Sequence, residues 1–117
     1  MSELVLHGIP NCDTVRKARR SLDAAGVGHR FVDLRKDGLE EKRLRRWVDA
    51  VGWETLINRR GATWRRLSQD QREGLDAEHA IALMLEQPAL IRRPIIEHGD
   101  RVHVGWSDET ASRLGAS

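Results

Sequence analysis

Cys12 is the only cysteine of this 117-residue chain, and its position makes it a candidate nucleophile. It follows the turn-forming residues Gly8-Ile9-Pro10-Asn11 and directly precedes a stretch in which apolar residues recur at helical spacing. The first turn of a helix presents free N–H groups and the positive end of the helix dipole, and both stabilise a thiolate. Because the thiolate is the reactive form, we expect Cys12 to be a nucleophile rather than an inert, buried cysteine.

Cations beside Cys12 extend this prediction to anion binding. Arg16 and Lys17 lie about one helical turn beyond Cys12 and would add positive potential. The free N–H groups of that turn can also hold an oxyanion or a carboxylate. The net charge of the whole chain is only +2, which does not by itself indicate binding to nucleic acid.

Two strands and a helix are predicted to position Cys12. Residues 4–7 form a short apolar run that suits a buried strand, and 29–34 alternate as a second strand does. Between them, 13–25 have the apolar spacing of a helix, which Gly26 is well placed to end. This order predicts a βαβ unit with a parallel strand pair.

The rest of the chain is predicted to add helices and then a hairpin. An apolar stripe over 39–51, ended by Gly52, predicts a helix, and Asp76 is a candidate N-cap for another that stops before Pro88. Residues 94–97 and 101–104 predict a tight hairpin, and Ser107 begins a last helix. We therefore expect an α/β fold with a mixed sheet, as one domain spanning 1–117.

Composition excludes several classes of protein. One cysteine cannot form an intrachain disulfide, a multi-thiolate zinc site or an iron–sulfur cluster. The five histidines show no metal-ligand spacing. No apolar run is long enough to span a bilayer, and residues 1–4 lack the features of a signal peptide. We expect a cytoplasmic protein without a metal, a membrane anchor or direct contact with nucleic acid.

Three separated segments read GIPNCDTVRKA over 8–18, NRRGATW over 58–64 and LIRRPII over 90–96. Together they resemble the ArsC/Spx/YffB family of arsenate-reductase-like proteins, most of all its YffB-like branch. The resemblance implies a thioredoxin-like mixed sheet with flanking helices and a helical insert, and it implies that Cys12 is the nucleophile. Thr14 and Arg16 match the family pattern Cys-x-Thr-x-Arg, and Arg93 matches an anion-binding arginine joined to Pro94 by a cis bond.

The chain departs from arsenate reductases at positions that serve the oxyanion. Gly8 stands where those enzymes have a histidine, and the basic position before the last helix is replaced within 104–106. Their middle arginine aligns nearest Asn58, with Arg59 and Arg60 beside it. Because a multiply charged oxyanion needs several charge-assisted bonds, these departures favour thiol chemistry over arsenate.

The resulting hypothesis is a glutathione-dependent thiol reductase. Cys12 attacks an oxidised sulfur, or arsenate, and glutathione resolves the adduct because no second cysteine exists. Glutathione is thus a cosubstrate, no cofactor is bound, and glutaredoxin is a candidate further partner. The expected site comprises Cys12 as catalytic residue and, for the anion or glutathione, Thr14, Arg16, Arg59, Arg60, Arg93 and Pro94.

The alternative is a Spx-like adaptor that binds RNA polymerase. Spx proteins carry Cys-x-x-Cys at this turn, whereas Ile9 and Val15 flank Cys12 here. An adaptor of this sequence would therefore work without an internal disulfide switch.

Overall fold

The computed structural model describes residues 3–116 and divides into two compact units. Unit 1 joins the chain up to Gly38 to the chain from Arg93 onward, and unit 2 is Leu39–Arg92. No shift in composition marks these boundaries in the sequence. The single domain expected over 1–117 stays a prediction. Among the described residues, no helix has the length and apolar character needed to cross a bilayer.

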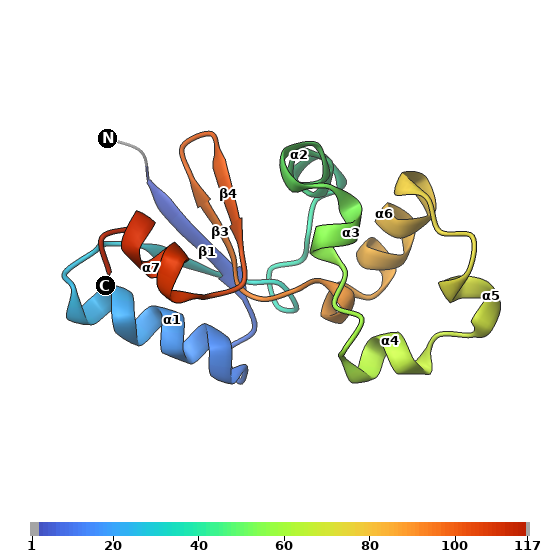
Figure 1. The fold of residues 1–117 in the computed structure, drawn as a ribbon, viewed down its shortest axis with the longest axis horizontal. Helices are drawn as coiled ribbons and strands as arrows, with labels where there is room; N and C mark the ends of the chain where they lie inside the picture. Colours follow the sequence, from blue (N-terminus) through green and yellow to red (C-terminus); the bar gives the residue numbers. More distant parts are fainter. Residues whose placement is uncertain (1–2, 117) are drawn as a thin grey trace. The chain divides into compact units, whose positions relative to one another are not determined.

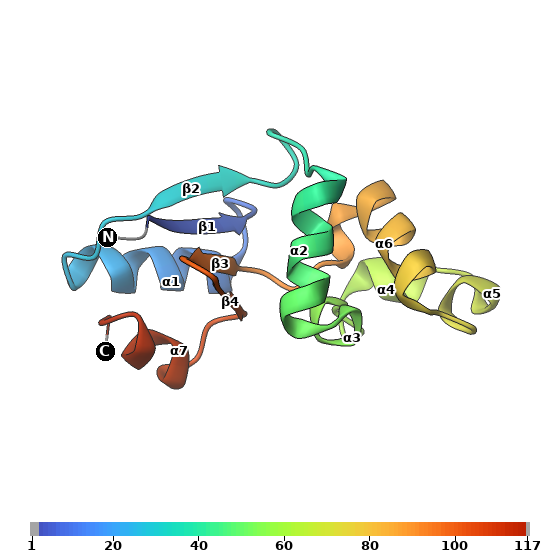
Figure 2. The same cartoon turned by 90° about the horizontal axis from the view of Figure 1, so that it is seen from above.

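Unit 1 contains a four-stranded mixed sheet in the order β2-β1-β3-β4, which Figure 2 shows from above. The strands are β1 (Leu4–Gly8), β2 (Arg30–Asp33), β3 (Ile95–His98) and β4 (Arg101–Val104). β1 pairs parallel with β2 and antiparallel with β3, and β3 forms a hairpin with β4. The predicted βαβ unit and hairpin are confirmed, and with them the α/β fold with a mixed sheet.

The core of unit 1 lies between this sheet and helices α1 (Asp13–Ala24) and α7 (Asp108–Arg113), which Figure 1 shows along the sheet. Apolar spacing predicts Val15, Ala18, Leu22 and Ala25 as one face of this helix. The first three have no exposed surface, whereas Ala25 is exposed because the helix ends before it. The buried members of the cluster are Leu4, Leu6, Val15, Ala18, Leu22, Ile96 and Leu114. α1 is therefore held against β1 by packing along its length, which fixes where its first turn lies.

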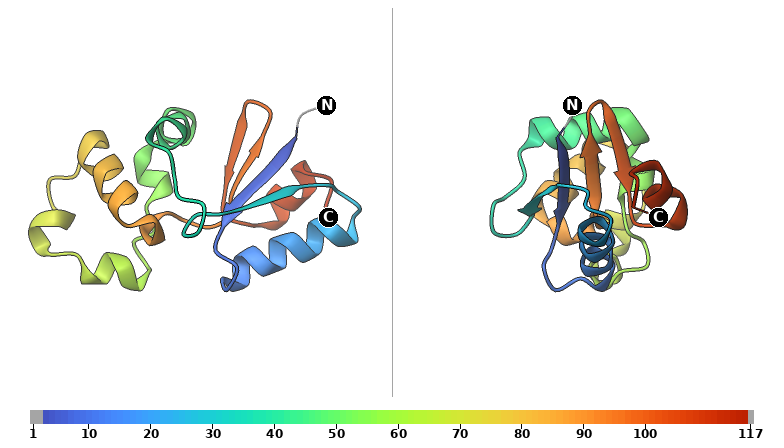
Figure 3. Two further views of the ribbon diagram at one scale, coloured as in Figure 1. Left: turned by 180° about the vertical axis from the view of Figure 1, so that it is seen from behind. Right: turned by 90° about the vertical axis from the view of Figure 1, so that its left-hand side faces the viewer.

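α7 follows the β3–β4 hairpin, as Figure 3 shows, and begins at the residue predicted to cap it. The Ser107 side chain accepts a hydrogen bond from the N–H of Thr110. This bond satisfies one of the four N–H groups that the first turn of α7 leaves without a partner in the helix.

We expect Ser107→Ala to lower the free energy of unfolding by about 1 kcal/mol, the usual contribution of a serine N-cap. Chemical denaturation monitored by circular dichroism measures the change. Ser112→Ala is the matched control, because Ser112 lies exposed inside the same helix, where alanine is the better helix former. Equal stability of the two variants would contradict the capping role.

Unit 2 is helical and is built around a fully buried tryptophan, Trp47, on α2. The predicted helices are present as α2 (Glu41–Val51), which ends at Gly52 with a φ of 86°, and α6 (Ala77–Glu86), whose N-cap Asp76 accepts from the N–H of His79. Arg45 on α2 donates two hydrogen bonds to the Glu78 carboxylate on α6, at 2.8 and 2.9 Å. The sequence did not predict the short elements between and after them: α3 (Trp53–Leu56), α4 (Ala62–Arg66), α5 (Gln69–Arg72) and the 3₁₀ turn η1 (Pro88–Leu90).

Candidate active site around Cys12

Cys12 is the N-cap residue of α1, as the sequence predicts. Its N–H donates to the carbonyl of Ile9 at 3.1 Å, which closes the turn after β1. Its own carbonyl accepts the first bond of the helix, from the N–H of Arg16 at 2.9 Å. The side chain is half-buried and free of any disulfide. Backbone bonds on both sides therefore fix the sulfur at the start of the helix.

The surroundings of Cys12 favour the thiolate. Burial raises the pKa of the thiol, but hydrogen bonds from the backbone N–H of Val15, the Arg93 side chain and the backbone N–H of Thr14 lower it, and so does the charge of Arg93. The lowering effects prevail, and the pKa lies below its ordinary value. The side chain of Cys12 forms no regular N-cap hydrogen bond, so the N–H groups of this turn lower the pKa without a regular cap.

Arg93 reaches Cys12 from a distant part of the sequence. It precedes β3 in unit 1, and its peptide bond to the buried residue Pro94 is cis, as the family resemblance implies. The arginine is partly buried, not a fully solvated residue at the entry to a strand. The structure thus brings together Cys12, Arg93 and the backbone of Thr14. The Thr14 side chain is exposed, and its backbone is what acts on the sulfur.

Arg16 is engaged with the loop rather than with the sulfur. Its Nη2 donates to the carbonyl of Asn11 at 3.2 Å and to Oδ1 of Asp13 at 2.9 Å. Both side chains of the Arg16–Asp13 pair are well exposed, so the ion pair itself is weak. Arg16 therefore orders the turn that carries Cys12, and its predicted role in binding an anion is untested.

Arg59 and Arg60 belong to unit 2, in the loop between α3 and α4. Both are exposed, and the Arg59 guanidinium lies 5.6 Å from the centre of the Trp64 ring. The N–H of Arg60 donates to the side chain of Asn58 at 3.1 Å. Their predicted part in binding an anion stays a prediction.

A buried polar pair joins two strands of the sheet in unit 1. His7 on β1 is 1% exposed, and its Nε2 lies 2.6 Å from Oε1 of Glu97 on β3. The sequence placed His7 at the end of a strand but gave no signal for Glu97, because the pair forms only when β1 and β3 align. No local pattern indicates Glu97, because Ile95-Ile96-Glu97-His98 does not alternate between apolar and polar residues.

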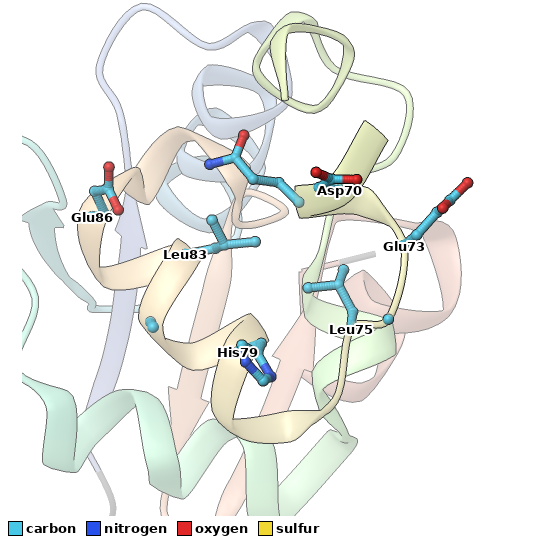
Figure 4. A pocket seen from close by; sticks show the side chains of 9 residues that line it. Asp70, Glu73, Leu75, His79, Leu83 and Glu86 are labelled. Carbon is cyan, nitrogen blue, oxygen red and sulfur yellow. The ribbon is translucent and has the colours of Figure 1, made fainter. Parts of the chain in front are cut away.

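A hollow of about 370 Å³ opens in unit 2 between α5 and α6, as Figure 4 shows. Leu75 and Leu83 line it together with the carboxylates of Asp70, Glu73 and Glu86. None of the predicted site residues lines it. Three carboxylates repel an oxyanion or the carboxylates of glutathione, so this hollow does not suit the anionic ligands expected at Cys12.

The lowered pKa of Cys12 predicts that its reactivity persists below the range of a free thiol. We expect the rate of alkylation by iodoacetamide to rise with pH to a midpoint below about 8.5, the value for free cysteine. A pH–rate profile measures it directly, because the chain has no other thiol. After denaturation in urea the midpoint should return to the free value. A native midpoint at or above that of the denatured chain would contradict an activated thiolate.

Comparison with known proteins agrees with this architecture. The ArsC family model matches residues 7–114. The solved structure of the YffB (PA3664) protein is 42% identical, with a TM-score of 0.92 over 97% of this chain and 99% of that one. An arsenate reductase (ArsC) related protein from Brucella melitensis is 39% identical, with a TM-score of 0.79 over 95% of this chain and 92% of that one.

A curated relative lies in the regulatory branch. The global transcriptional regulator Spx of Listeria innocua is 27% identical over 114 residues, which cover 95% of this chain and 86% of Spx. The matched range 7–114 includes Cys12, Arg93 and the whole helical insert, so the likeness extends through both units. The chain is a member of the ArsC family, with an arsenate-reductase-like fold.

Proposed function

We propose that the protein is a thiol oxidoreductase that exchanges disulfides through Cys12, with glutathione as cosubstrate. The observation that carries the proposal is the place of Cys12 as the N-cap residue of a helix of 12 residues, where two backbone N–H groups of the first turn and the Arg93 side chain lower its pKa. Membership of a family that contains arsenate-reductase-related proteins supports thiol chemistry at this position.

The proposed reaction needs only one protein thiol. The Cys12 thiolate attacks the glutathione sulfur of a mixed disulfide RS–SG, forming a Cys12–SG bond while the electron pair of the broken bond leaves with RS⁻. A second glutathione thiolate attacks the Cys12–SG bond, releasing oxidised glutathione and regenerating the Cys12 thiolate. The net change is reduction of RS–SG by one glutathione. External resolution follows because the chain has a single cysteine.

Arg93 is the candidate cation for a glutathione carboxylate or an oxyanion. Its planar guanidinium offers a bidentate fork, and Arg93 is one of the groups that lower the pKa of Cys12. Arg16, Arg59 and Arg60, with Thr14 and Pro94, complete the proposed binding set, and glutaredoxin is the proposed further partner. A glutathione-dependent reaction suits a reducing compartment, and we propose the cytoplasm.

The Spx relative supports a second candidate, an adaptor that binds RNA polymerase. This chain would play that role without an intrachain disulfide, since it has one cysteine. Thiol reactivity separates the candidates: an oxidoreductase depends on Cys12, whereas an adaptor retains polymerase binding after Cys12 is replaced. A pull-down of purified RNA polymerase by wild-type protein and Cys12→Ser tests this directly.

The decisive experiment is a direct test of adduct formation and turnover. We expect wild-type protein treated with oxidised glutathione to gain one glutathionyl group on Cys12, and reduced glutathione to remove it, as measured by mass spectrometry. Arsenate turnover with glutathione and glutaredoxin should be weak beside that of a mixed disulfide. A protein that forms no adduct would refute the proposal. Efficient, saturable arsenate turnover would instead identify arsenate as the substrate in place of the mixed disulfide.

A further inference from the structure

Gly8 and Val15 make a contact that leaves no room for a side chain at position 8. Gly8 ends β1, and Val15 lies in the first turn of α1. A Cβ built on Gly8 would lie 2.7 Å from Cγ2 of Val15 and 3.2 Å from its Cγ1. Gly8 is not among the glycines with a positive φ, so the need for glycine here is one of space rather than of backbone conformation.

Val15 has little freedom to move away from Gly8. Its side chain has no exposed surface and packs in the core with Leu6 and Leu22. A β-branched side chain in a helix is also restricted to one preferred rotamer. The contact between Gly8 and Val15 therefore sets how closely the first turn of α1 approaches the end of β1.

The same residue acts on the sulfur through its backbone. The backbone N–H of Val15 comes first among the groups that lower the pKa of the Cys12 thiol. Because the N–H and the side chain belong to one residue in the first turn, a shift of the side chain moves the N–H as well. We propose that Val15 is a positioning residue for disulfide exchange: its contact with Gly8 aims the N–H of the first helical turn at the Cys12 sulfur. The disulfide exchange in this inference rests on the proposed function, whereas the contact between Gly8 and Val15 rests on geometry.

The contact also bears on the class of substrate. The groups of the described residues that stabilise the Cys12 anion are two backbone amides and a guanidinium, and none of these releases a proton near neutral pH. Position 8 is closed to a side chain that could serve as an acid. The site therefore favours a leaving group that departs as a stable anion. A disulfide fits, because the bond that breaks leaves its electron pair on a thiolate without a proton transfer.

A double-mutant cycle tests the contact. Gly8→Ala places its Cβ against Cγ2 of Val15 and should move the first turn, raising the midpoint of the alkylation profile and slowing reaction with oxidised glutathione at pH 7 at least tenfold. Val15→Ala removes both Cγ atoms and should slow that reaction a few-fold. In Gly8→Ala/Val15→Ala the nearest of these atoms is Cβ of residue 15 at 3.5 Å, an ordinary contact. The double variant should therefore react faster than Gly8→Ala.

Two further outcomes of the double-mutant cycle decide whether the inference holds. If Gly8→Ala does not fold, as judged by circular dichroism, the double variant must still react faster than Val15→Ala, because the new methyl group fills part of the space left. Wild-type reactivity in Gly8→Ala, or a double variant as slow as the product of the two single effects, would overturn the inference. Alkylation needs no glutathione, so a cycle that holds for alkylation in a protein that forms no glutathione adduct would reject the proposed function alone.

Discussion

We expect Cys12→Ser to abolish disulfide exchange, with the rate of thiol release from a glutathione mixed disulfide falling to the uncatalysed background. A serine hydroxyl stays protonated at neutral pH and cannot form the sulfur–sulfur bond on which the proposed reaction depends. No other thiol in the chain can take over, because Cys12 is the only cysteine. Steady-state assays with excess glutathione, and mass spectrometry of the recovered protein, measure the loss.

The control for this variant is the fold. Cys12 is half-buried and makes no disulfide, so an oxygen in place of sulfur should leave the thermal midpoint close to that of the wild type. Serine is also a favoured N-cap residue, which supports the start of α1. A folded Cys12→Ser protein that still turned over the mixed disulfide would show that the reaction does not pass through this residue.

The elements that position Cys12 could be predicted because their signals are local. Apolar spacing marked Val15, Ala18 and Leu22 as part of the buried face of α1, and all three are fully buried, although Ala25, marked with them, is exposed. The turn around Gly99, between β3 and β4, and the cap at Ser107 are likewise properties of a few neighbouring residues. Parallel pairing of β1 with β2 follows from the helix that connects them.

Other features were missed for different reasons. α3, α4 and α5 have four or five residues each, too short for a helical period to stand out. α4 and α5 bury none of their residues, and α5 begins at a capping box between Ser68 and Gln71, a local signal that could have indicated it. The sequence also carried no sign of the boundary between the two units near Gly38 and Arg93. Compactness is a property of contacts between segments, and composition does not record it.

At the candidate site, too, local features could be predicted and contacts between distant segments could not. That Cys12 lies at a helix N-terminus could be derived from the chain around it, whereas the contact with Arg93 requires the loop before β3 to return to the start of α1. Family resemblance supplied Arg93, and residue spacing alone did not. Arg16 illustrates the limit of spacing: it lies one turn from Cys12, yet its guanidinium is bonded to Asn11 and Asp13.

We expect Arg93→Ala to slow alkylation of Cys12 about tenfold at a pH below the native midpoint. The arginine lowers the pKa of the thiol both as a hydrogen-bond donor and through its charge, so its removal raises that pKa and reduces the thiolate fraction. Hydrogen bonds to charged groups contribute about 1.5–3 kcal/mol, and the lower end applies because Cys12 is only half-buried. Arg93→Lys should restore the charge but only part of the rate, since lysine lacks the planar fork.

The same interaction should appear in the pH dependence of stability. Because the folded pKa of Cys12 is lowered, the thiolate stabilises the folded state at a pH above the unfolded value of about 8.5, and this contribution is lost as the pH falls through the folded pKa. The difference in unfolding free energy between wild type and Arg93→Ala should therefore be larger on the alkaline side than in acid. In a Cys12→Ser background that pH-dependent part should vanish, because no thiolate remains for Arg93 to stabilise. If Arg93→Ala changed stability equally at both pH values, in both backgrounds, Arg93 would be packing against the loop rather than holding the reactive anion.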